Sequence, residues 1–393
     1  MMVEKSAFRA EMENILSGKT LWERLQSESR PIVLYGMGDG AEKIFSACKE
    51  RGIPVSGVMA SDAFVRGQSF LGYPVRTLAA TEEALGECVY LLSFGSSLPD
   101  VMAHIDAVRE THTLYAPDVP LFGGGIWDRE CLTENLDRLD RVYSLLGDDL
   151  SKKVFTSVIS YRMTGNLSYL SRCETPREEM YTLLGVGENE DYLDLGAYDG
   201  DTLREFLSET GGSYGSLTAV EPDPKSRRKL LERMEKAYPG ITSDPRFTLI
   251  EGGVWSEEGT LSFDNAAGRN SSLSEGGKLS VNVFSVDGIR QGKGCSFIKM
   301  DVEGSEREAL IGAGKTLSGL RPKLIFSAYH RTEDLFALPE LLRKLAPEYK
   351  LCLRHQPYYP AWEVNFCAKA EYRRKGVLFC VTCREAGLHR DYM

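Results

Sequence analysis

Three carboxylates and a lysine follow an apolar run within the stretch SFIKMDVEGSEREALIGAG, residues 296–314. The acids are Asp301, Glu303 and Glu306, and the lysine is Lys299. A carboxylate at the end of a buried strand can take the proton of a hydroxyl while a bond to its oxygen forms. The same acids could also begin an ordinary helix, where its dipole favours them and they face water. An earlier glycine turn helps to decide between these two interpretations.

That turn is DLGAYDGDT, residues 194–202, which follows a strand-like run and precedes a helical pattern. Its acid and glycines, Asp194, Gly196 and Gly200, have the spacing acid-x-Gly-x-x-x-Gly. A glycine turn between strand and helix lets the backbone approach a ligand and points the helix N-terminus at it. A nicotinamide or flavin fingerprint would require a glycine also at position 198, where Tyr198 stands.

The charges around this turn favour a cationic ligand. Asp199 and Asp201 disfavour a pyrophosphate and favour sulfonium and ammonium groups. Glu221 ends the next strand-like run, where an acid can accept hydrogen bonds from both ribose hydroxyls. A third strand end, in LIEGGVWSEEGTLSF, would border an adenine. We therefore predict an S-adenosylmethionine site formed by Asp194, Gly196, Ala197, Tyr198, Asp199, Gly200, Thr202, Glu221, Pro222, Gly252, Gly253, Val254 and Asp301. The alternative is a helix-capping turn accompanied by an exposed glutamate.

The order of these motifs resembles the FkbM-type methyltransferases. The resemblance rests on DLGAYDGDT, AVEPDP, GGVWSEEGTLSF, IKMDVEGSEREALIGA, RPKLIFSAYHRTEDLFALPELL and LCLRH, over roughly residues 151–368. KMDVEGSE, the most specific element of that family, is intact. The resemblance implies a class I methyltransferase fold and the use of S-adenosylmethionine. It also implies methylation of a hydroxyl on a sugar or natural product.

In that fold the end of the fourth strand lies beside the methyl-bearing sulfur. We predict Asp301, Glu303 and His330 as catalytic residues. Asp301 is the first candidate base, while Glu303 shares this role, binds substrate or caps the following helix. His330, at the end of the next strand, is the other candidate because its ordinary pKa suits neutral pH. Tyr329 could orient the acceptor, and Glu306 is expected to be a solvated first-turn acid.

No metal ligands are assigned from the sequence. Asp301, Glu303 and His330 are ligand types without a diagnostic spacing, so the use of a divalent metal stays open. Lys299 should face away from its apolar strand neighbours and could pair with an acid. His355 is at least as well explained by a structural role as by catalysis.

Length, charge and composition restrict the classes of partner. A chain of 393 residues usually forms more than one domain. A net charge of −10 argues against nucleic acid as the main partner. No apolar run approaches a membrane span, and nine scattered cysteines suit a reducing compartment, so we expect a cytoplasmic protein. We expect a small-molecule or saccharide substrate; oligomeric state, including a homo-oligomer, stays open.

Alternating strand and helix patterns indicate two α/β units. We predict a smaller Rossmann-like domain at 1–125, a helical bridge and lead-in at 126–185, and the doubly wound methyltransferase sheet at 186–393. The first thirty residues have helical spacing. Residues 264–277 are expected to be a loop that walls the substrate pocket. The sequence VLFCVTC, which contains Cys380 and Cys383, is an alternative last strand to VNFCAKA.

The first α/β unit contains a second glycine turn, GMGDGA at residues 36–41. It fits a dinucleotide pattern, with Asp62 as a late candidate for the acid after the second strand. The region also resembles N-terminal domains of sugar-modifying acyltransferases, which implies nucleotide-sugar binding. Packing or dimerisation explains it equally well.

Three functional hypotheses follow. The first is an S-adenosylmethionine-dependent O-methyltransferase acting on a saccharide, nucleotide-sugar or secondary metabolite. The second is a nucleotide-sugar dehydrogenase or epimerase using the first glycine turn, although the usual Tyr-x-x-x-Lys pair is missing. The third is a non-catalytic, cofactor-binding regulatory protein. The sequence does not identify the methyl acceptor.

Overall fold

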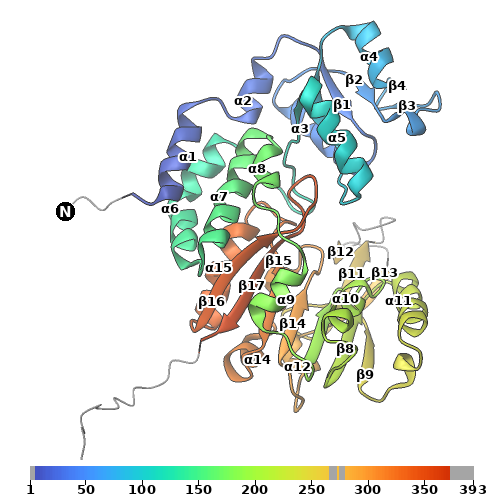
Figure 1. Ribbon diagram of the computed structural model, residues 1–393, viewed down its shortest axis with the longest axis vertical. Helices are drawn as coiled ribbons and strands as arrows, with labels where there is room; N and C mark the ends of the chain where they lie inside the picture. Colours follow the sequence, from blue (N-terminus) through green and yellow to red (C-terminus); the bar gives the residue numbers. More distant parts are fainter. Residues whose placement is uncertain (1–4, 265–271, 274–278, 372–393) are drawn as a thin grey trace, which may run out of the picture.

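A computed structural model describes residues 5–264, 272–273 and 279–371. Two large β-sheets and a layer of helices make up most of the chain, and a small four-stranded sheet is attached to the second large sheet (Figure 1). The alternative last strand containing Cys380 and Cys383 lies outside the described residues. The three predicted domain ranges stay a prediction, but each large sheet lies in the range expected for it.

The first sheet has the strand order β3-β4-β2-β1-β5-β6, with all neighbours parallel except β3 and β4. Its strands are β1 (Ile32–Tyr35), β2 (Val55–Met59), β3 (Ser69–Phe70), β4 (Tyr73–Arg76), β5 (Val89–Leu92) and β6 (Thr113–Tyr115). The helices that follow them are α3 (Asp39–Glu50), α4 (Leu78–Leu85) and α5 (Pro99–Thr111), with the 3-10 turn η1 (Asp62–Phe64) after β2. The order reverses at β1, as in other doubly wound folds.

A layer of helices lies between the two large sheets (Figure 1). Its members are α1 (Ala7–Ser17), α6 (Arg129–Leu145), α7 (Asp149–Thr164) and α8 (Ser168–Ser171). The first thirty residues are helical as predicted, but Thr20 begins a separate helix, α2 (Leu21–Gln26), through a capping box with Glu23. Helix α1 packs against α6 and α7. Helix α1 therefore belongs to the helical layer.

The second large sheet has the order β16-β17-β15-β14-β7-β8-β9. Its strands are β7 (Asp191–Leu195), β8 (Ser216–Glu221), β9 (Phe247–Glu251), β14 (Phe297–Met300), β15 (Lys323–Ser327), β16 (Tyr349–His355) and β17 (Val364–Ala370). Five strands are parallel, and β17 runs antiparallel to β15 and β16. The strand order reverses between β7 and β14, so their carboxyl ends mark the topological switch point where ligands bind in open α/β sheets.

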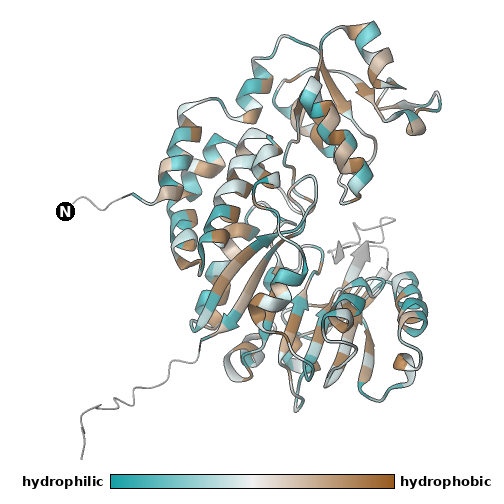
Figure 2. Ribbon diagram, in the orientation of Figure 1, coloured by the Kyte–Doolittle hydropathy of each residue, from teal (hydrophilic) through white to brown (hydrophobic). Residues whose placement is uncertain are grey.

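Helices cover both faces of this sheet. They are α9 (Glu178–Leu184), α10 (Asp201–Glu209), α11 (Pro224–Ala237), α12 (Val286–Ile289), α13 (Glu306–Ile311), α14 (Gly314–Gly319) and α15 (Asp334–Leu345). Neighbouring residues of a strand face opposite cores: Phe297 packs with α10 and α11, whereas Ile298 packs with α13 and α15. Figure 2 shows hydrophobic residues along the strands of both large sheets. Both sides of the sheet are thus buried, as a parallel sheet requires.

The sequence analysis did not foresee the small sheet. Strands β10 (Gly253–Val254), β11 (Gly259–Asp264), β12 (Ser272–Leu273) and β13 (Leu279–Phe284) pair in the order β10-β13-β11-β12. Part of the segment expected to be a loop is therefore strand, and its remainder lies outside the described residues. Short runs such as LSVNVF carry the alternating pattern, but their partners are known only from the fold.

One contiguous hydrophobic core connects the two large sheets. It includes Val33 of β1, Phe155 of α7 and Ile298 of β14, all fully buried. Among the helices that the structure describes, none has both the length and the apolar character needed to cross a bilayer.

Candidate active site

The loop after β7 folds tightly against the end of β14. Gly196, Tyr198 and Gly200 have φ values of 81°, 43° and 79°. A Cβ on Gly196 would lie 1.9 Å from the carbonyl oxygen of Asp301. Glycine is therefore required here both for its left-handed backbone and for this close approach. The loop brings residues from two neighbouring strand ends together.

Asp194 lies beneath the loop and is fully buried. Its Oδ2 accepts a hydrogen bond of 2.5 Å from the hydroxyl of Thr202, and its Oδ1 has no partner in the described part of the chain. Burial raises the pKa of Asp194 to about 6, although Lys299 and Thr202 lower it. Asp194 therefore holds the start of α10 in place and leaves one buried acceptor atom for a ligand or water.

Glu221 ends β8 next to the same loop and is 6% exposed. Its carboxylate oxygens accept hydrogen bonds of 2.8 Å from the backbone N–H groups of Tyr198 and Asp223. Burial raises the pKa of Glu221 to about 7. Each oxygen keeps a second lone pair, so the side chain is held in place and can still accept bonds from hydroxyls.

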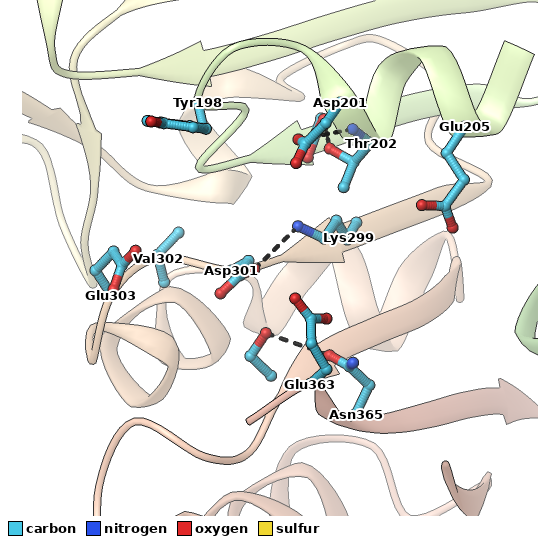
Figure 3. A network of polar contacts seen from close by, with 12 residues as sticks. Tyr198, Asp201, Thr202, Glu205, Lys299, Asp301, Val302, Glu303, Glu363 and Asn365 are labelled. Carbon is cyan, nitrogen blue, oxygen red and sulfur yellow. Dashed lines mark hydrogen bonds and ion pairs between the residues drawn. The ribbon is translucent and has the colours of Figure 1, made fainter. Parts of the chain in front are cut away.

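Asp199 does not have the electrostatic role predicted from the sequence. Its carboxylate forms an ion pair with Arg233 of α11, and Arg204 lies 3.9 Å from its other oxygen. The charge of Asp199 is therefore neutralised by arginine and does not attract a cationic ligand. Asp201, the other acid predicted to favour a cation, is exposed. Its Oδ1 accepts from the N–H of Thr202 over 2.9 Å (Figure 3).

The third strand end lies beside Glu221. The N–H of Gly252 donates to the carbonyl of Glu221 over 3.3 Å, and a Cβ on Gly252 would lie 2.6 Å from the carbonyl of Asn282. Gly253 and Val254 pair with β13. Val254 is buried in the core, so its side chain packs internally. Only the backbone of this turn is placed to border a ligand held by Glu221; Pro222, next to Glu221, is partly exposed.

Asp301 follows β14 and is held by three neighbours. Lys299 Nζ lies 3.3 Å from its Oδ2, and the hydroxyl of Tyr329 donates to both oxygens over 3.3 and 3.4 Å. Burial opposes ionisation of Asp301, but Lys299 and His330 lower its pKa to about 2. Lys299 pairs with an acid, as the strand alternation predicted. Asp194 and Asp301 in turn raise the pKa of Lys299 against the effect of burial.

His330 follows β15 and is 1% exposed. Its Nδ1 lies 2.8 Å from Oε1 of Glu306, while its Nε2 lies 3.5 Å from Asp301 and 3.4 Å from Glu303. Burial alone would lower the pKa of His330, but these three carboxylates raise it to about 10. A free base titrating near neutrality, as expected from the sequence, does not match these surroundings.

Glu306 was expected to face water, and this expectation is wrong because the residue is 1% exposed. Glu303 and Gly304 have φ values of 51° and 87°, so the chain turns sharply and α13 starts beneath the end of β15. Oε1 of Glu306 then accepts from the N–H of Val302 over 3.0 Å as well as contacting His330. A left-handed glutamate is strained, by about 1–3 kcal/mol.

Glu303 occupies the accessible side of this cluster. Its side chain is 34% exposed, against 23% for Asp301 and 1% for His330. Burial and the neighbouring Asp301 and Glu306 raise the pKa of Glu303, although His330 lowers it. Asp301 and Glu303 are thus the members of the cluster that a ligand can reach.

Sequence reasoning missed an ion-pair network on the other side of Lys299. Arg177, just before α9, lies 2.8 Å from Glu363 and 3.5 Å from Glu205. Figure 3 shows Glu205 and Glu363 around the same space as Lys299 and Asp301. Glu363 also has a left-handed φ of 59°. No local motif marks these residues, because they meet only through the packing of α9, α10 and the segment before β17.

The first glycine turn has different surroundings. A Cβ on Gly36 would lie 2.6 Å from the ring of Phe94, and Asp62 lies in the exposed turn η1, beyond the end of β2. Lys43 is engaged by Asp39 at 3.0 Å and by the Leu121 carbonyl at 2.7 Å. A cavity of about 210 Å³ lies beside this turn, and Trp362 from the second sheet's loop helps to line it. This geometry lacks the acid that a dinucleotide ribose needs at a strand end.

His355 is fully buried in β16, and burial lowers its pKa to about 4. It is therefore neutral and packed, in agreement with a structural role.

Comparisons with known proteins bear on the family and the fold. Residues 194–351 match the family model of the methyltransferase FkbM domain. No curated protein matches the sequence. The crystal structure of methyltransferase FkbM from Methylobacillus flagellatus KT matches with a TM-score of 0.67 and 20% identity, covering 91% of this chain and 93% of that one.

Two other solved structures match over about half of the chain. They are Aeropyrum pernix fibrillarin with bound S-adenosyl-L-methionine (TM-score 0.31, 14% identity, 48% of this chain and 73% of that one) and precorrin-6y C5,15-methyltransferase from Geobacter metallireducens GS-15 (0.32, 10%, 50% and 86%). These two are too distant to support an argument. The Methylobacillus structure shows a shared fold over nearly the whole chain, including the first sheet.

Proposed function

We propose that this chain, a methyltransferase with an FkbM domain at residues 194–351, transfers a methyl group from S-adenosylmethionine to a hydroxyl of a saccharide, nucleotide-sugar or secondary metabolite. Its fold is the α/β fold of class I methyltransferases, preceded by a second doubly wound sheet. The net charge of −10 supports a small acceptor over a nucleic acid.

One observation carries this proposal: the loop after β7 joins two sets of acids at the topological switch point. Gly196 packs on the carbonyl of Asp301 on one side, and the N–H of Tyr198 donates to Glu221 on the other. A ligand lying across this loop would meet Glu221 at one end and Asp301 at the other. Such an arrangement suits a long ligand with a ribose at one end and a reactive group at the other.

The residues present fit S-adenosylmethionine. Glu221 has lone pairs for the two ribose hydroxyls, and the buried Oδ1 of Asp194 lacks a partner in the described chain. Two cations, Lys299 and Arg177, share this space with more carboxylates than they can balance, namely Asp194, Asp201, Glu205, Asp301 and Glu363. The remaining negative charge favours a cationic group. When bound, S-adenosylmethionine supplies an electrophilic methyl group on a positively charged sulfur.

The acceptor side is formed by Asp301 and Glu303. Both are partly exposed, whereas His330 is buried behind them. The acceptor hydroxyl must lose its proton as its oxygen gains the methyl group, and the accessible carboxylates are placed to receive that proton. Tyr329 and Lys299 orient Asp301 through their direct contacts. His330 supports both carboxylates from behind.

Isothermal titration with S-adenosylhomocysteine tests the cofactor assignment. We expect micromolar binding by the wild type, lost in an Asp194→Ala, Glu221→Ala double variant. Glu221→Gln serves as a milder variant if the double variant does not fold. Glu251→Gln, at the exposed end of the neighbouring strand β9, is the matched control and should bind normally. Absence of binding by folded wild-type protein would reject the proposal.

The acceptor class is tested separately by methyl transfer from labelled S-adenosylmethionine. Fractions of saccharides, nucleotide-sugars and hydroxylated metabolites would be offered to the wild type and to the Glu303→Gln variant. Incorporation of base-stable label into one class, reduced in the variant, supports O-methylation. Label incorporated only into nucleic acid or protein contradicts the proposed acceptor.

A further inference from the structure

The carboxyl ends of the adjacent strands β14 and β15 bring three metal-ligand types together. Nε2 of His330 lies 3.5 Å from Oδ1 of Asp301 and 3.4 Å from Oε2 of Glu303. Two ligand atoms, each about 2.1 Å from one ion and 90–110° apart, lie about 3.0–3.4 Å from each other. The observed separations from Nε2 are therefore close to those around a bound ion.

Glu306 gives the imidazole the support typical of a metal-binding histidine. Its Oε1 lies 2.8 Å from Nδ1 of His330 and also accepts from the N–H of Val302 over 3.0 Å. A carboxylate at Nδ1 favours the tautomer in which Nε2 carries the lone pair. Without a metal, the carboxylates of Asp301 and Glu303 favour a proton on Nε2; a bound ion would replace that proton, and the lone pair of Nε2 would then face the two carboxylates. The ring is further fixed by packing against Phe122, with a centroid separation of 5.8 Å.

The accessible and the buried members of the cluster have different roles. Ligand atoms of Asp301, Glu306 and His330 all lie within 4.8 Å of one another. Glu306, however, is 1% exposed and already bonded to Nδ1, so it is suited to orient the ring. Glu303 is 34% exposed and faces Nε2. Asp301 and Glu303 are both partly exposed, so a hydroxyl could reach an ion held between them and Nε2.

The charges of the cluster also favour a cation. Asp301, Glu303 and Glu306 surround one imidazole, and Lys299 contacts Asp301 alone. If a bound ion displaces the proton of the imidazole, three carboxylates face a single lysine, which leaves two negative charges for the ion to balance. A divalent cation would balance them. One imidazole nitrogen together with carboxylate oxygens suits a first-row ion such as Mn²⁺ better than Mg²⁺, which prefers oxygen ligands.

We propose that Nε2 of His330 and the carboxylates of Asp301 and Glu303 bind a divalent cation of the Mn²⁺ class, with Glu306 positioning the imidazole. A hydroxyl bound to such an ion loses its proton more easily, and the free oxygen of either carboxylate can accept it. Only this catalytic role rests on the proposed function. Binding of the ion itself does not depend on methyl transfer.

Titration of the full-length, chelator-treated protein with MnCl₂ alone tests the site, with free Mn²⁺ followed by electron paramagnetic resonance. We expect one saturable site per chain, weakened at least about tenfold in His330→Gln, Asp301→Asn and Glu303→Gln. Glu306→Gln should weaken binding about 10–100-fold through the imidazole. Asp199→Asn is the matched control, because its carboxylate lies at the cofactor loop but pairs with Arg233. It should bind Mn²⁺ normally.

Thermal unfolding tests whether each variant is folded, and S-adenosylhomocysteine binding adds a second test for the variants other than Asp301→Asn, because Asp301 is also assigned to the cofactor site. If His330→Gln does not fold, the partly exposed Glu303→Gln still tests the assignment. No Mn²⁺ binding by wild type that binds S-adenosylhomocysteine overturns this inference and leaves the proposed function standing. Mn²⁺ binding without S-adenosylhomocysteine binding supports this inference and rejects the proposed function. Unchanged Mn²⁺ affinity in Asp301→Asn, Glu303→Gln and His330→Gln also overturns the inference.

Discussion

The two large sheets of this protein are both doubly wound, yet among the described residues only the second presents buried acids at the strand ends beside its glycine turn. Each has a glycine turn after its first strand, at Gly36 in one and at Gly196 in the other. In the first sheet the neighbouring strand end presents Phe94 to the turn. In the second, neighbouring strand ends present Glu221 and Asp301. Topology places a loop at the switch point, but the residues of the adjacent strand ends decide its chemistry.

The largest difference between the two turns should appear with Gly196→Ala. The new Cβ would meet the Asp301 carbonyl, and φ is unfavourable for alanine, so we expect destabilisation by about 2–4 kcal/mol and loss of S-adenosylhomocysteine binding. Gly38→Ala in the first turn is the control: it has a positive φ but no neighbour within 4 Å. Thermal unfolding and calorimetry measure both effects. Equal losses of S-adenosylhomocysteine affinity in Gly196→Ala and Gly38→Ala would contradict the proposed difference between the two turns.

Glu306→Gln tests the buried polar cluster that distinguishes the second sheet. Removing one partner of a buried ion pair costs about 3–5 kcal/mol, so the free energy of unfolding should fall by an amount of this order. Asp62→Asn, in the exposed turn after β2 of the first sheet, should change it by less than about 0.5 kcal/mol. Chemical denaturation measures both. A neutral Glu306→Gln would contradict the assigned ion pair.

The alternation of strands and helices and the glycine turn after β7 were predictable from sequence, because apolar strand runs alternate with helical stretches from Asp191 onward. Strand alternation indicated that Lys299 faces away from its apolar neighbours, and pairing with an acid was one possible role. The contact between Glu306 and His330 was not predictable, since it depends on the left-handed turn at Glu303 and on a neighbouring strand. Arg177 and Glu363 were missed for the same reason: they meet through tertiary packing. The neutralised charge of Asp199 required knowledge of where α11 places Arg233.

Glu221→Gln tests the ribose end of the proposed cofactor site. Hydrogen bonds to a charged group contribute about 1.5–3 kcal/mol, so we expect S-adenosylhomocysteine affinity to fall roughly 10–150-fold. Glu251→Gln, its register partner on β9, should leave the affinity within about twofold, because it is exposed and pairs with Arg227. Calorimetric titration of both variants with S-adenosylhomocysteine measures the two affinities, and equal affinities would contradict the role of Glu221.

The affinity for S-adenosylhomocysteine should also depend on pH through Glu221. Burial raises the pKa of this carboxyl to about 7, and the ionised form is the one that accepts two hydroxyl hydrogen bonds. Affinity should therefore rise with pH and level off above about 7, and fall by up to about tenfold per unit below it. Titrations from pH 6 to 8.5 measure this profile. A wild-type profile as flat as that of Glu221→Gln would exclude this role.

The smallest expected effect concerns the first sheet. Reduced nicotinamide cofactors should show no saturable binding in a fluorescence titration, because Phe94 covers Gly36 and Asp62 lies beyond the strand end. Saturable low-micromolar binding, lost in a Gly36→Val variant, would restore the dehydrogenase hypothesis.

Hydrogen exchange with and without S-adenosylhomocysteine tests the central claim most directly, because it reports on both glycine turns in one experiment. The account predicts added protection in peptides covering residues 194–202 and 221–223, with residues 36–44 unchanged. Protection confined to residues 36–44 would place the ligand on the first sheet and contradict the account.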